Sequence, residues 1–274
     1  MMVMHKDIHA DDSAVLPRLL TGPIKSAHAL ITRDIAMRIL RGEYPPGSLL
    51  PPEGDLIDQY TVSRTALREA IKTLAAKGLL VSKTKIGTRI LNESYWNLYD
   101  PQVLSWRIEL GVDNGFLRKI FEVRQALEPA AAAQAAVRRT ALNIERMQYA
   151  LNLMDKPHHT RKTYAEPDLV FHQEVLIASG NPFMQTFSSI IEACILHAFA
   201  ISAPIDTDER FKRSINRHAL VLAAIKDGNP HGACLAMSDV IRESIENARF
   251  GLAEEPVVIA LPLDLFSKAQ PVDH

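Results

Sequence analysis

The sequence predicts a mainly α-helical protein, in which an N-terminal winged helix-turn-helix is followed by an all-α antiparallel bundle of helices. Three observations predict this fold class. Three helical patterns and a hairpin pattern follow one another in residues 24–91, and nearly every later segment up to residue 250 has apolar residues at helical spacing. Charge also separates the two parts. Residues 60–90 contain seven basic residues and one acidic residue, a net charge of +6, whereas residues 91–274 have a net charge of −5.

The first two helices are predicted from apolar spacing and from helix-breaking residues. Apolar residues recur every three or four positions from residue 24 to residue 40, which is typical of an amphipathic helix. The segment "GEYPPGSLLPPEGD" stops this helix, because its glycines and prolines favour an extended turn. Pro52 can then occupy the first turn of a short second helix that runs through Tyr60.

A third helix is expected over residues 64–77, with Ser63 as its N-cap and Gly78 at its end. The segment "LLVSKTKIGTRIL" follows, and it has two short β-prone runs around a tip that contains lysine and glycine. Three helices followed by such a hairpin describe a winged helix-turn-helix.

The remainder of the chain is predicted to be a helical domain. Its short separators, such as "SGNP" and "DGNP", are typical of antiparallel neighbours in a bundle. The expected helices cover residues 115–138, 141–154, 163–179, 182–203, 206–227 and 230–250. The expected domain layout is a loose arm (1–22), the winged helix-turn-helix (23–92), a linker with a connecting helix (93–112), the helical domain (113–251) and a tail (252–274).

Bulk properties exclude several classes of protein. The chain of 274 residues is 47% hydrophobic, yet no apolar run approaches the roughly 18–20 residues that a membrane span needs. Its first residues lack the pattern of a secretory signal, and its two cysteines suit reduced core thiols. A cytoplasmic location is expected.

The basic segment predicts contacts with double-stranded DNA. In a helix-turn-helix, the N-terminal end of the second helix of the motif meets base edges, and an arginine can bond both acceptors of a guanine edge. Hydroxyls and cations nearby can hold phosphates. A surface helix with ordinary cations is the alternative, but helices, hairpin and charge agree on DNA. The candidate DNA-binding residues are Ser63, Arg64, Thr65, Arg68, Lys83, Lys85, Thr88 and Arg89.

These motifs resemble a known family. The segment "GEYPPGSLLPPEGDLIDQYTVSRTALREAIKTLAAKGLLVSKTKIGTRI" resembles the DNA-binding domain of the GntR superfamily of bacterial transcription factors. The segments "FEVRQALEPAAAAQAA", "DLVFHQEVLIASGNP" and "HALVLAAIKDGNPHGACLAM" resemble the FCD effector domain of its FadR subfamily. The segment "YWNLYDPQVLSWR" is also similar to regulators that respond to sugar acids such as galactonate. Two positions depart from the family pattern: Gly54 stands where an arginine is usual, and Lys85 where glycine is common.

Asp168 and His172 form a candidate metal site. They are four residues apart, so they share one face of a helix, and a carboxylate with an imidazole suits a divalent transition metal such as zinc, nickel or manganese. The resemblance implies His218 as a further ligand and a histidine as a fourth, where this chain has Val240.

Three interpretations of this group remain open. Asp168, His172 and His218 can hold a metal whose other positions are taken by water and an effector carboxylate. They can instead bind the effector without a metal, or simply pair in the core. Two histidines and one carboxylate are also the facial triad of non-haem iron oxygenases.

Arg124, in "EVRQALEP", is a candidate clamp for the effector carboxylate, because a buried guanidinium needs an anionic partner. The alternative is a structural salt bridge with Glu128 or Glu174.

The chain is therefore expected to be a transcriptional regulator and not an enzyme. A homodimeric repressor would bind a palindromic operator and leave it when a small carboxylate binds in the helical domain. The alternative is a metal-dependent enzyme of the 2-His-1-carboxylate type that carries an ancillary DNA-binding module. No second carboxylate, nucleophile or cofactor motif at useful spacing supports that alternative.

Overall fold

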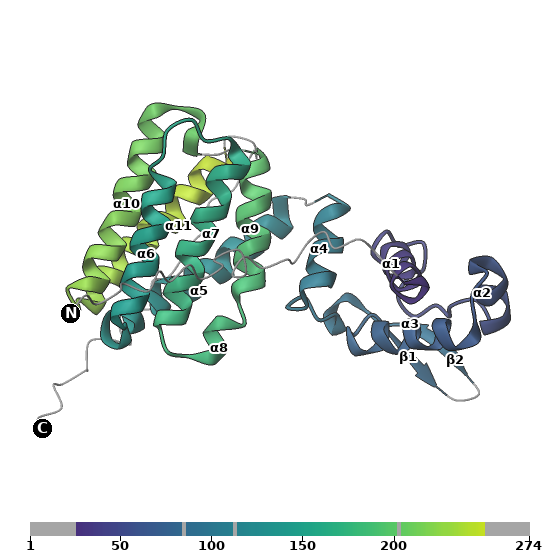
Figure 1. The fold of residues 1–274 in the computed structure, drawn as a ribbon. Helices are drawn as coiled ribbons and strands as arrows, with labels where there is room; N and C mark the ends of the chain where they lie inside the picture. Colours follow the sequence, from purple (N-terminus) through teal and green to yellow (C-terminus); the bar gives the residue numbers. More distant parts are fainter. Residues whose placement is uncertain (1–25, 84–85, 112–113, 202–203, 250–274) are drawn as a thin grey trace, which may run out of the picture. The chain divides into compact units, whose positions relative to one another are not determined.

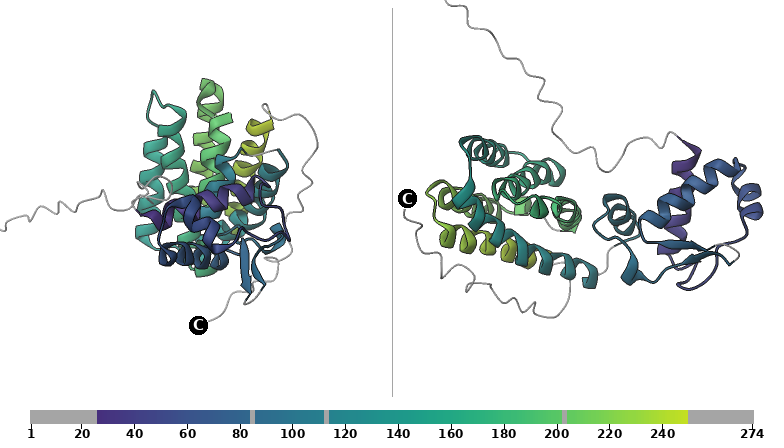
Figure 2. Two further views of the ribbon diagram at one scale, coloured as in Figure 1. Left: turned by 90° about the vertical axis from the view of Figure 1, so that its right-hand side faces the viewer. Right: turned by 90° about the horizontal axis from the view of Figure 1, so that it is seen from below.

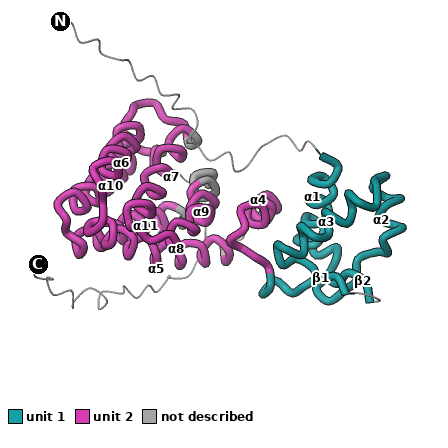
Figure 3. The backbone as a smooth tube through the Cα atoms, turned by 60° about the horizontal axis from the view of Figure 1, so that its bottom comes forward, with its two compact units in different colours: residues 1–95 teal, residues 96–274 magenta. Residues whose placement is uncertain are grey.

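The computed structural model describes residues 26–83, 86–111, 114–201 and 204–249. The chain divides into two compact units, residues 1–95 and residues 96–274, which are teal and magenta in Figure 3. The predicted arm (1–22), the predicted tail (252–274) and Lys85 lie outside the described residues.

The first unit has the predicted three helices and a wing (Figure 1). The elements are α1 (Ala27–Leu40), α2 (Glu53–Tyr60), α3 (Arg64–Ala76), β1 (Leu80–Lys83), β2 (Gly87–Ile90) and a 3-10 turn, Glu93–Tyr95. The two strands pair antiparallel, with Leu80 opposite Ile90. Leu49 forms an isolated bridge to Arg89, so the segment before α2 lies along β2.

Local chemistry explains where the helices of the first unit begin and turn. The Ser63 hydroxyl accepts a hydrogen bond from the amide of Ala66 at 3.2 Å, which makes it the predicted N-cap of α3. Thr61 ends α2 with a φ of 53°, and this left-handed residue makes the tight turn into α3. Pro52 stands at the N-cap of α2. The core of the unit contains Ile35, Leu56, Leu67, Leu74, Leu79 and Ile90.

The second unit is a helical bundle, and Figures 1 and 2 show its helices lying side by side. Its elements are α4 (Pro101–Glu109), α5 (Asn114–Arg138), α6 (Ala141–Met154), α7 (Arg161–Ala178), α8 (Pro182–Gln185), α9 (Ser188–Ile201), a 3-10 turn (Pro204–Asp206), α10 (Asp208–Lys226) and α11 (Pro230–Arg249). Helix α5 packs against α7, α9, α10 and α11, and therefore runs through the middle of the unit. The predicted fold class is confirmed.

The prediction of one continuous helix over residues 182–203 is wrong. The chain forms α8 and α9 instead, with a break at residues 186–187. At this break the Thr186 hydroxyl donates to the Phe183 carbonyl at 2.7 Å, and the Ser188 hydroxyl donates to the Gln185 carbonyl at 2.7 Å. Hydroxyls that bond carbonyls of the preceding turn compete with the helical ladder, which explains why the helix stops and restarts.

The separators "SGNP" and "DGNP" each end one helix and begin the next. Gly180 and Gly228 have φ values of 64° and 68°, a left-handed conformation that costs glycine least. In each segment the following asparagine, Asn181 or Asn229, accepts a hydrogen bond from an amide two or three residues further on. The same four-residue motif, a left-handed glycine followed by an asparagine cap, thus connects α7 to α8 and α10 to α11.

Arg138, the last residue of α5, and Arg139, which follows it, bond to carbonyls at these separators. Arg138 Nη1 donates to the Ser179 carbonyl at 2.9 Å, and Arg139 Nη2 donates to the Lys226 carbonyl at 3.2 Å. Both carbonyls belong to C-terminal ends of helices, where a cation is favourable. The end of α5 therefore ties the C-terminal ends of α7 and α10.

Candidate metal centre and DNA-reading surface

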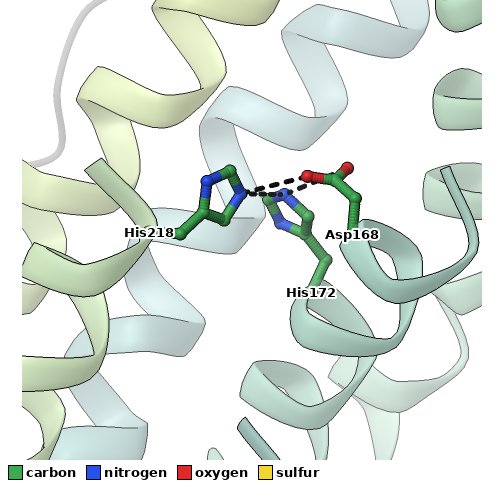
Figure 4. Close-up of side chains that lie close together, drawn as sticks. All are labelled: Asp168, His172 and His218. Atoms are coloured by element: carbon green, nitrogen blue, oxygen red, sulfur yellow. Dashed lines mark hydrogen bonds and ion pairs between the residues drawn. The ribbon is translucent and has the colours of Figure 1, made fainter. Parts of the chain in front are cut away.

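Asp168, His172 and His218 come together in the interior of the second unit (Figure 4). Helix α7 supplies the first two and α10 the third, and all three are buried. One possible ligand atom from each lies within 4.8 Å of the other two. Among the described residues, no other group of three or more His, Cys, Asp or Glu side chains lies close enough to hold a metal ion.

Hydrogen bonds on the outer nitrogens orient both imidazoles. His172 Nδ1 donates to Glu128 Oε2, and His218 Nδ1 donates to the Ser214 carbonyl at 2.8 Å. Each partner can only accept, so each Nδ1 carries a proton and each Nε2 faces the centre. The two Nε2 atoms lie 3.4 Å apart.

The spacing of these atoms fits a transition metal ion. Two nitrogen ligands at about 2.0–2.1 Å from a tetrahedral ion lie roughly 3.3–3.4 Å apart. The Nε2 separation of His172 and His218 matches this spacing, and Asp168 Oδ1 lies 3.2 Å from His218 Nε2. Imidazole nitrogens with one carboxylate oxygen are also a donor set that such ions prefer.

Electrostatics keep the Asp168 carboxyl ionised. Burial raises its pKa, but the hydrogen bond from His218 and the neighbouring positive charges outweigh burial, so the pKa lies below its usual value. Asp168 is therefore available as an anionic ligand at neutral pH.

Arg124 lies beside this centre and is paired with Glu128. Both side chains belong to α5, and Arg124 Nε lies 2.5 Å from Glu128 Oε1. Arg124 Nη2 also lies 3.5 Å from His172 Nε2. Of the two partners that the sequence suggested for a structural salt bridge, Glu128 is the one in contact. The other, Glu174, instead accepts a hydrogen bond from Asn143 Nδ2 at 2.7 Å.

Glu128 is a site residue that the sequence indicated only as a salt-bridge partner of Arg124. The Glu128 carboxylate is 1% exposed and contacts both Arg124 and His172. Burial raises the pKa of Glu128, but the charges of Arg124 and His172 outweigh it and lower the pKa to about 2. The four-residue spacing between Arg124 and Glu128 was the sequence signal for their pairing. The sequence had no signal for the contact between Glu128 and His172, because that contact depends on how α5 packs against α7.

A small pocket adjoins the metal centre, because Asp168 and His218 are among its lining residues. Its lining combines polar and apolar groups: Arg124, Asp168, Ile195, Pro204, Ser214, His218, Val240, Glu243, Ser244 and Asn247. Val240, on α11, contributes an apolar wall and has no atom that can bind a metal. The structure therefore brings together three of the ligands and Arg124, and it supplies no fourth ligand from the described residues.

The candidate DNA-binding residues at the start of α3 lie on the surface of the first unit. Arg64 and Arg68 are 69% and 61% exposed, and their Nε atoms lie 3.4 Å and 3.1 Å from Glu53 Oε1. One carboxylate of α2 thus contacts both arginines. Thr65 beside them is exposed, while the Ser63 hydroxyl serves as the cap.

The wing carries the remaining candidates. Lys83 and Arg89 are exposed, and Arg89 Nη1 donates to the Gly47 carbonyl at 2.7 Å. The Thr88 and Ser82 hydroxyls share a hydrogen bond at 2.8 Å across the two strands.

Hydropathy along the helices gives one further result. None of the helices in the described ranges is both long and apolar enough to cross a membrane.

Comparison with known proteins matches both units. The family described as "Bacterial regulatory proteins, gntR family" matches residues 29–90, and the FCD domain matches residues 119–243. The chain is 32% identical over 220 residues to the uncharacterized HTH-type transcriptional regulator YieP of Escherichia coli (strain K12), which covers 80% of this chain and 94% of that protein. It is 34% identical over 163 residues to the galactonate operon transcriptional repressor of the same strain, which covers 60% of this chain and 71% of that protein.

A solved structure with the description "Lar controls the expression of the Listeria monocytogenes agr system and mediates virulence" shares the fold. Its TM-score is 0.51 at 18% identity, and the match covers 84% of this chain and 99% of that one.

A winged helix-turn-helix followed by a helical unit with a buried Asp-His-His group defines a DNA-binding transcriptional regulator. The chain belongs to the GntR family, in its FadR subfamily, and its helical unit contains an FCD domain. Its domains and relatives are those of transcriptional regulators and not of enzymes, so the expectation that it is not an enzyme is confirmed.

Proposed function

We propose that this regulator is a cytoplasmic repressor that binds a palindromic operator as a homodimer and leaves it when a small carboxylate binds in the helical unit. The observation that carries the proposal is the Asp-His-His group, which stands beside a pocket that is also lined by Arg124. An arginine among polar lining groups suits a small anion.

In this proposal Asp168, His172 and His218 hold a divalent transition metal, either zinc, nickel or manganese. Three protein ligands leave coordination positions for water and for an oxygen of the effector. The metal would supply positive charge for the carboxylate. Arg124 would hold the same carboxylate through hydrogen bonds from its guanidinium, and Val240 would pack against the effector carbon atoms.

Sugar acids are the effector class to test first. The description of one relative as a galactonate operon repressor supports this choice. The serine, glutamate and asparagine side chains of the pocket lining also supply hydrogen-bonding groups for hydroxyls.

On the DNA side, we propose that Arg64 and Arg68 bond guanine edges in the major groove. The hydroxyls at the start of α3 and the wing residues would contact phosphates or the minor groove. These supporting contacts are assigned to Ser63, Thr65, Lys83, Lys85, Thr88 and Arg89.

The effector can release the operator only through a difference in its affinity for two arrangements of the dimer. One arrangement would match the spacing of the two half-sites, and the effector would favour the other.

A thermal-shift screen with sugar acids and dicarboxylates, each with and without zinc, would identify the effector class. The effector found should then release operator DNA from the wild-type protein. Arg124→Ala should keep operator affinity and lose release. Arg146→Ala, which changes a half-exposed arginine near Glu174, is the matched control and should behave as wild type. Normal release by Arg124→Ala would refute the clamp.

A further inference from the structure

Glu128 has two different partners, one on each carboxylate oxygen. Its Oε1 accepts from Arg124 Nε at 2.5 Å, and its Oε2 accepts from His172 Nδ1. The side chain is 1% exposed, so no water competes for these contacts. A buried carboxylate is stable only when it is paired, and here the two partners are the proposed effector clamp and a proposed metal ligand.

We infer that Glu128 is a positioning residue that prepares both halves of the site. By accepting a hydrogen bond from Nδ1–H, it keeps His172 in the tautomer whose Nε2 lone pair faces Asp168 and His218. By pairing with Arg124 Nε, it holds the guanidinium at the wall of the pocket. The inference rests on the proposed function, because a metal would use that lone pair.

The charge of Glu128 matters as well as its hydrogen bonds. Arg124 Nη2 lies 3.5 Å from His172 Nε2, so a fixed cation stands beside the position that the metal would occupy. Two cations at such short range repel each other in a dry site, and the Glu128 carboxylate, which contacts both Arg124 and His172, offsets part of the repulsion. Glu128 therefore permits a cationic clamp and a cationic metal to share one small site.

Glu128→Gln separates this role from simple packing. Glutamine keeps the size of the side chain and one oxygen acceptor, but it has no charge. Its amide group also places an N–H donor against Arg124 Nε or His172 Nδ1, although both of these atoms are donors themselves. Glu174→Gln is the matched control. Glu174 is also buried, belongs to α7 and accepts from Asn143, but it does not contact the metal centre.

The experiment uses the full-length protein and two measurements. Nitrogen-15 NMR of the metal-free protein reports which nitrogen of His172 carries the proton. Titration with Co²⁺, followed by visible absorption, reports metal affinity and coordination. We expect Nδ1 protonation in the wild type and in Glu174→Gln, together with equal Co²⁺ affinity. We expect Glu128→Gln to lose this tautomer and to bind Co²⁺ about 10- to 100-fold more weakly.

Each outcome decides a separate question. Wild-type Co²⁺ affinity and spectrum in Glu128→Gln would overturn the inference, and so would a wild-type His172 protonated on Nε2 alone. A wild-type protein that binds no Co²⁺ would overturn the proposed metal site, while the NMR result would still decide the role of Glu128. If Glu128→Gln does not fold, Glu128→Asp replaces it. This shorter carboxylate keeps the charge but cannot reach both partners, so Co²⁺ binding as tight as in the wild type would also overturn the inference.

Discussion

Gly54 offers a direct test of how α2 meets DNA. It lies in the first turn of α2, is exposed, and a Cβ built on it has no atom within 4 Å. An arginine is usual at this position in the family pattern that the segment resembles. Gly54→Arg therefore adds a cation with no steric cost, and we expect the added guanidinium to contact one phosphate in each half-site.

The magnitude follows from counterion release. Each phosphate contact adds about −0.9 to the slope of log affinity against log salt, so a dimer gains roughly −1.8. Between about 50 mM and 200 mM salt, this slope makes affinity fall by roughly 12-fold more than in the wild type. The stability of α2 should change little. Removing a helical glycine gains up to about 1 kcal/mol, and a cation near a helix N-terminus costs about 0.3–1 kcal/mol.

Fluorescence anisotropy with a DNA duplex selected by the wild-type protein measures this slope. Gly54→Ala is the control, because it makes the same change in helix propensity without adding charge. We expect a steeper slope and tighter binding at low salt for Gly54→Arg, and neither change for Gly54→Ala. A slope equal to that of Gly54→Ala would show that the first turn of α2 does not approach the phosphates.

Three further predictions follow from the two sites. Val240→His should tighten zinc binding by about 10-fold or more, because it adds a fourth nitrogen at the wall of the pocket; competition with a chelating dye measures this, and unchanged affinity would place α11 too far from the ion. Folding lowers the pKa of Glu128 from 4.5 to about 2. The ionised carboxylate therefore adds to the free energy of unfolding in full above the unfolded pKa, and this stabilisation is lost as the pH falls through the folded pKa. In urea unfolding, the free energy of unfolding of the wild type should therefore fall by about 3 kcal/mol more than that of Glu128→Gln between about pH 5 and pH 2. An equal fall in the two proteins would contradict a buried, ionised Glu128. Arg64→Ala and Arg68→Ala should each weaken operator binding by about 10- to 100-fold, since a bidentate guanine contact is worth about 1–3 kcal/mol. Both side chains are mostly exposed, so the melting temperature should not change, and wild-type affinity in the double variant would exclude α3 as the reading helix.

Local patterns predicted most of the helices because each depends on residues close in sequence. The predicted helix over residues 141–154 has the observed bounds of α6, whose start is fixed by the Thr140 cap. The Ser63 cap of α3 is confirmed for the same reason. The break between α8 and α9 was missed, because apolar spacing continues through residues 186–187 while side-chain hydroxyls take the carbonyls of the previous turn.

The candidate site was predictable in part. Helical spacing places Asp168 with His172, and the family pattern added His218, which the structure brings to the same centre. The contact between Glu128 and His172 joins residues 44 positions apart. No local pattern determines such a pair, since it depends on how α5 packs against α7. The shape of the pocket depends on tertiary packing in the same way.

The two arginines that end α5 have a mechanical consequence. Arg138 and Arg139 fasten α7 and α10 at the same end, through the Ser179 and Lys226 carbonyls. The ligands for the metal centre lie further along these two helices, away from the fastened ends. Toward their other ends, the Tyr164 and Ser214 hydroxyls share a buried hydrogen bond at 2.9 Å, and the Tyr164 ring packs against Phe211. The two helices are therefore joined on both sides of the metal ligands, so that the spacing between Asp168, His172 and His218 is set by contacts at each end.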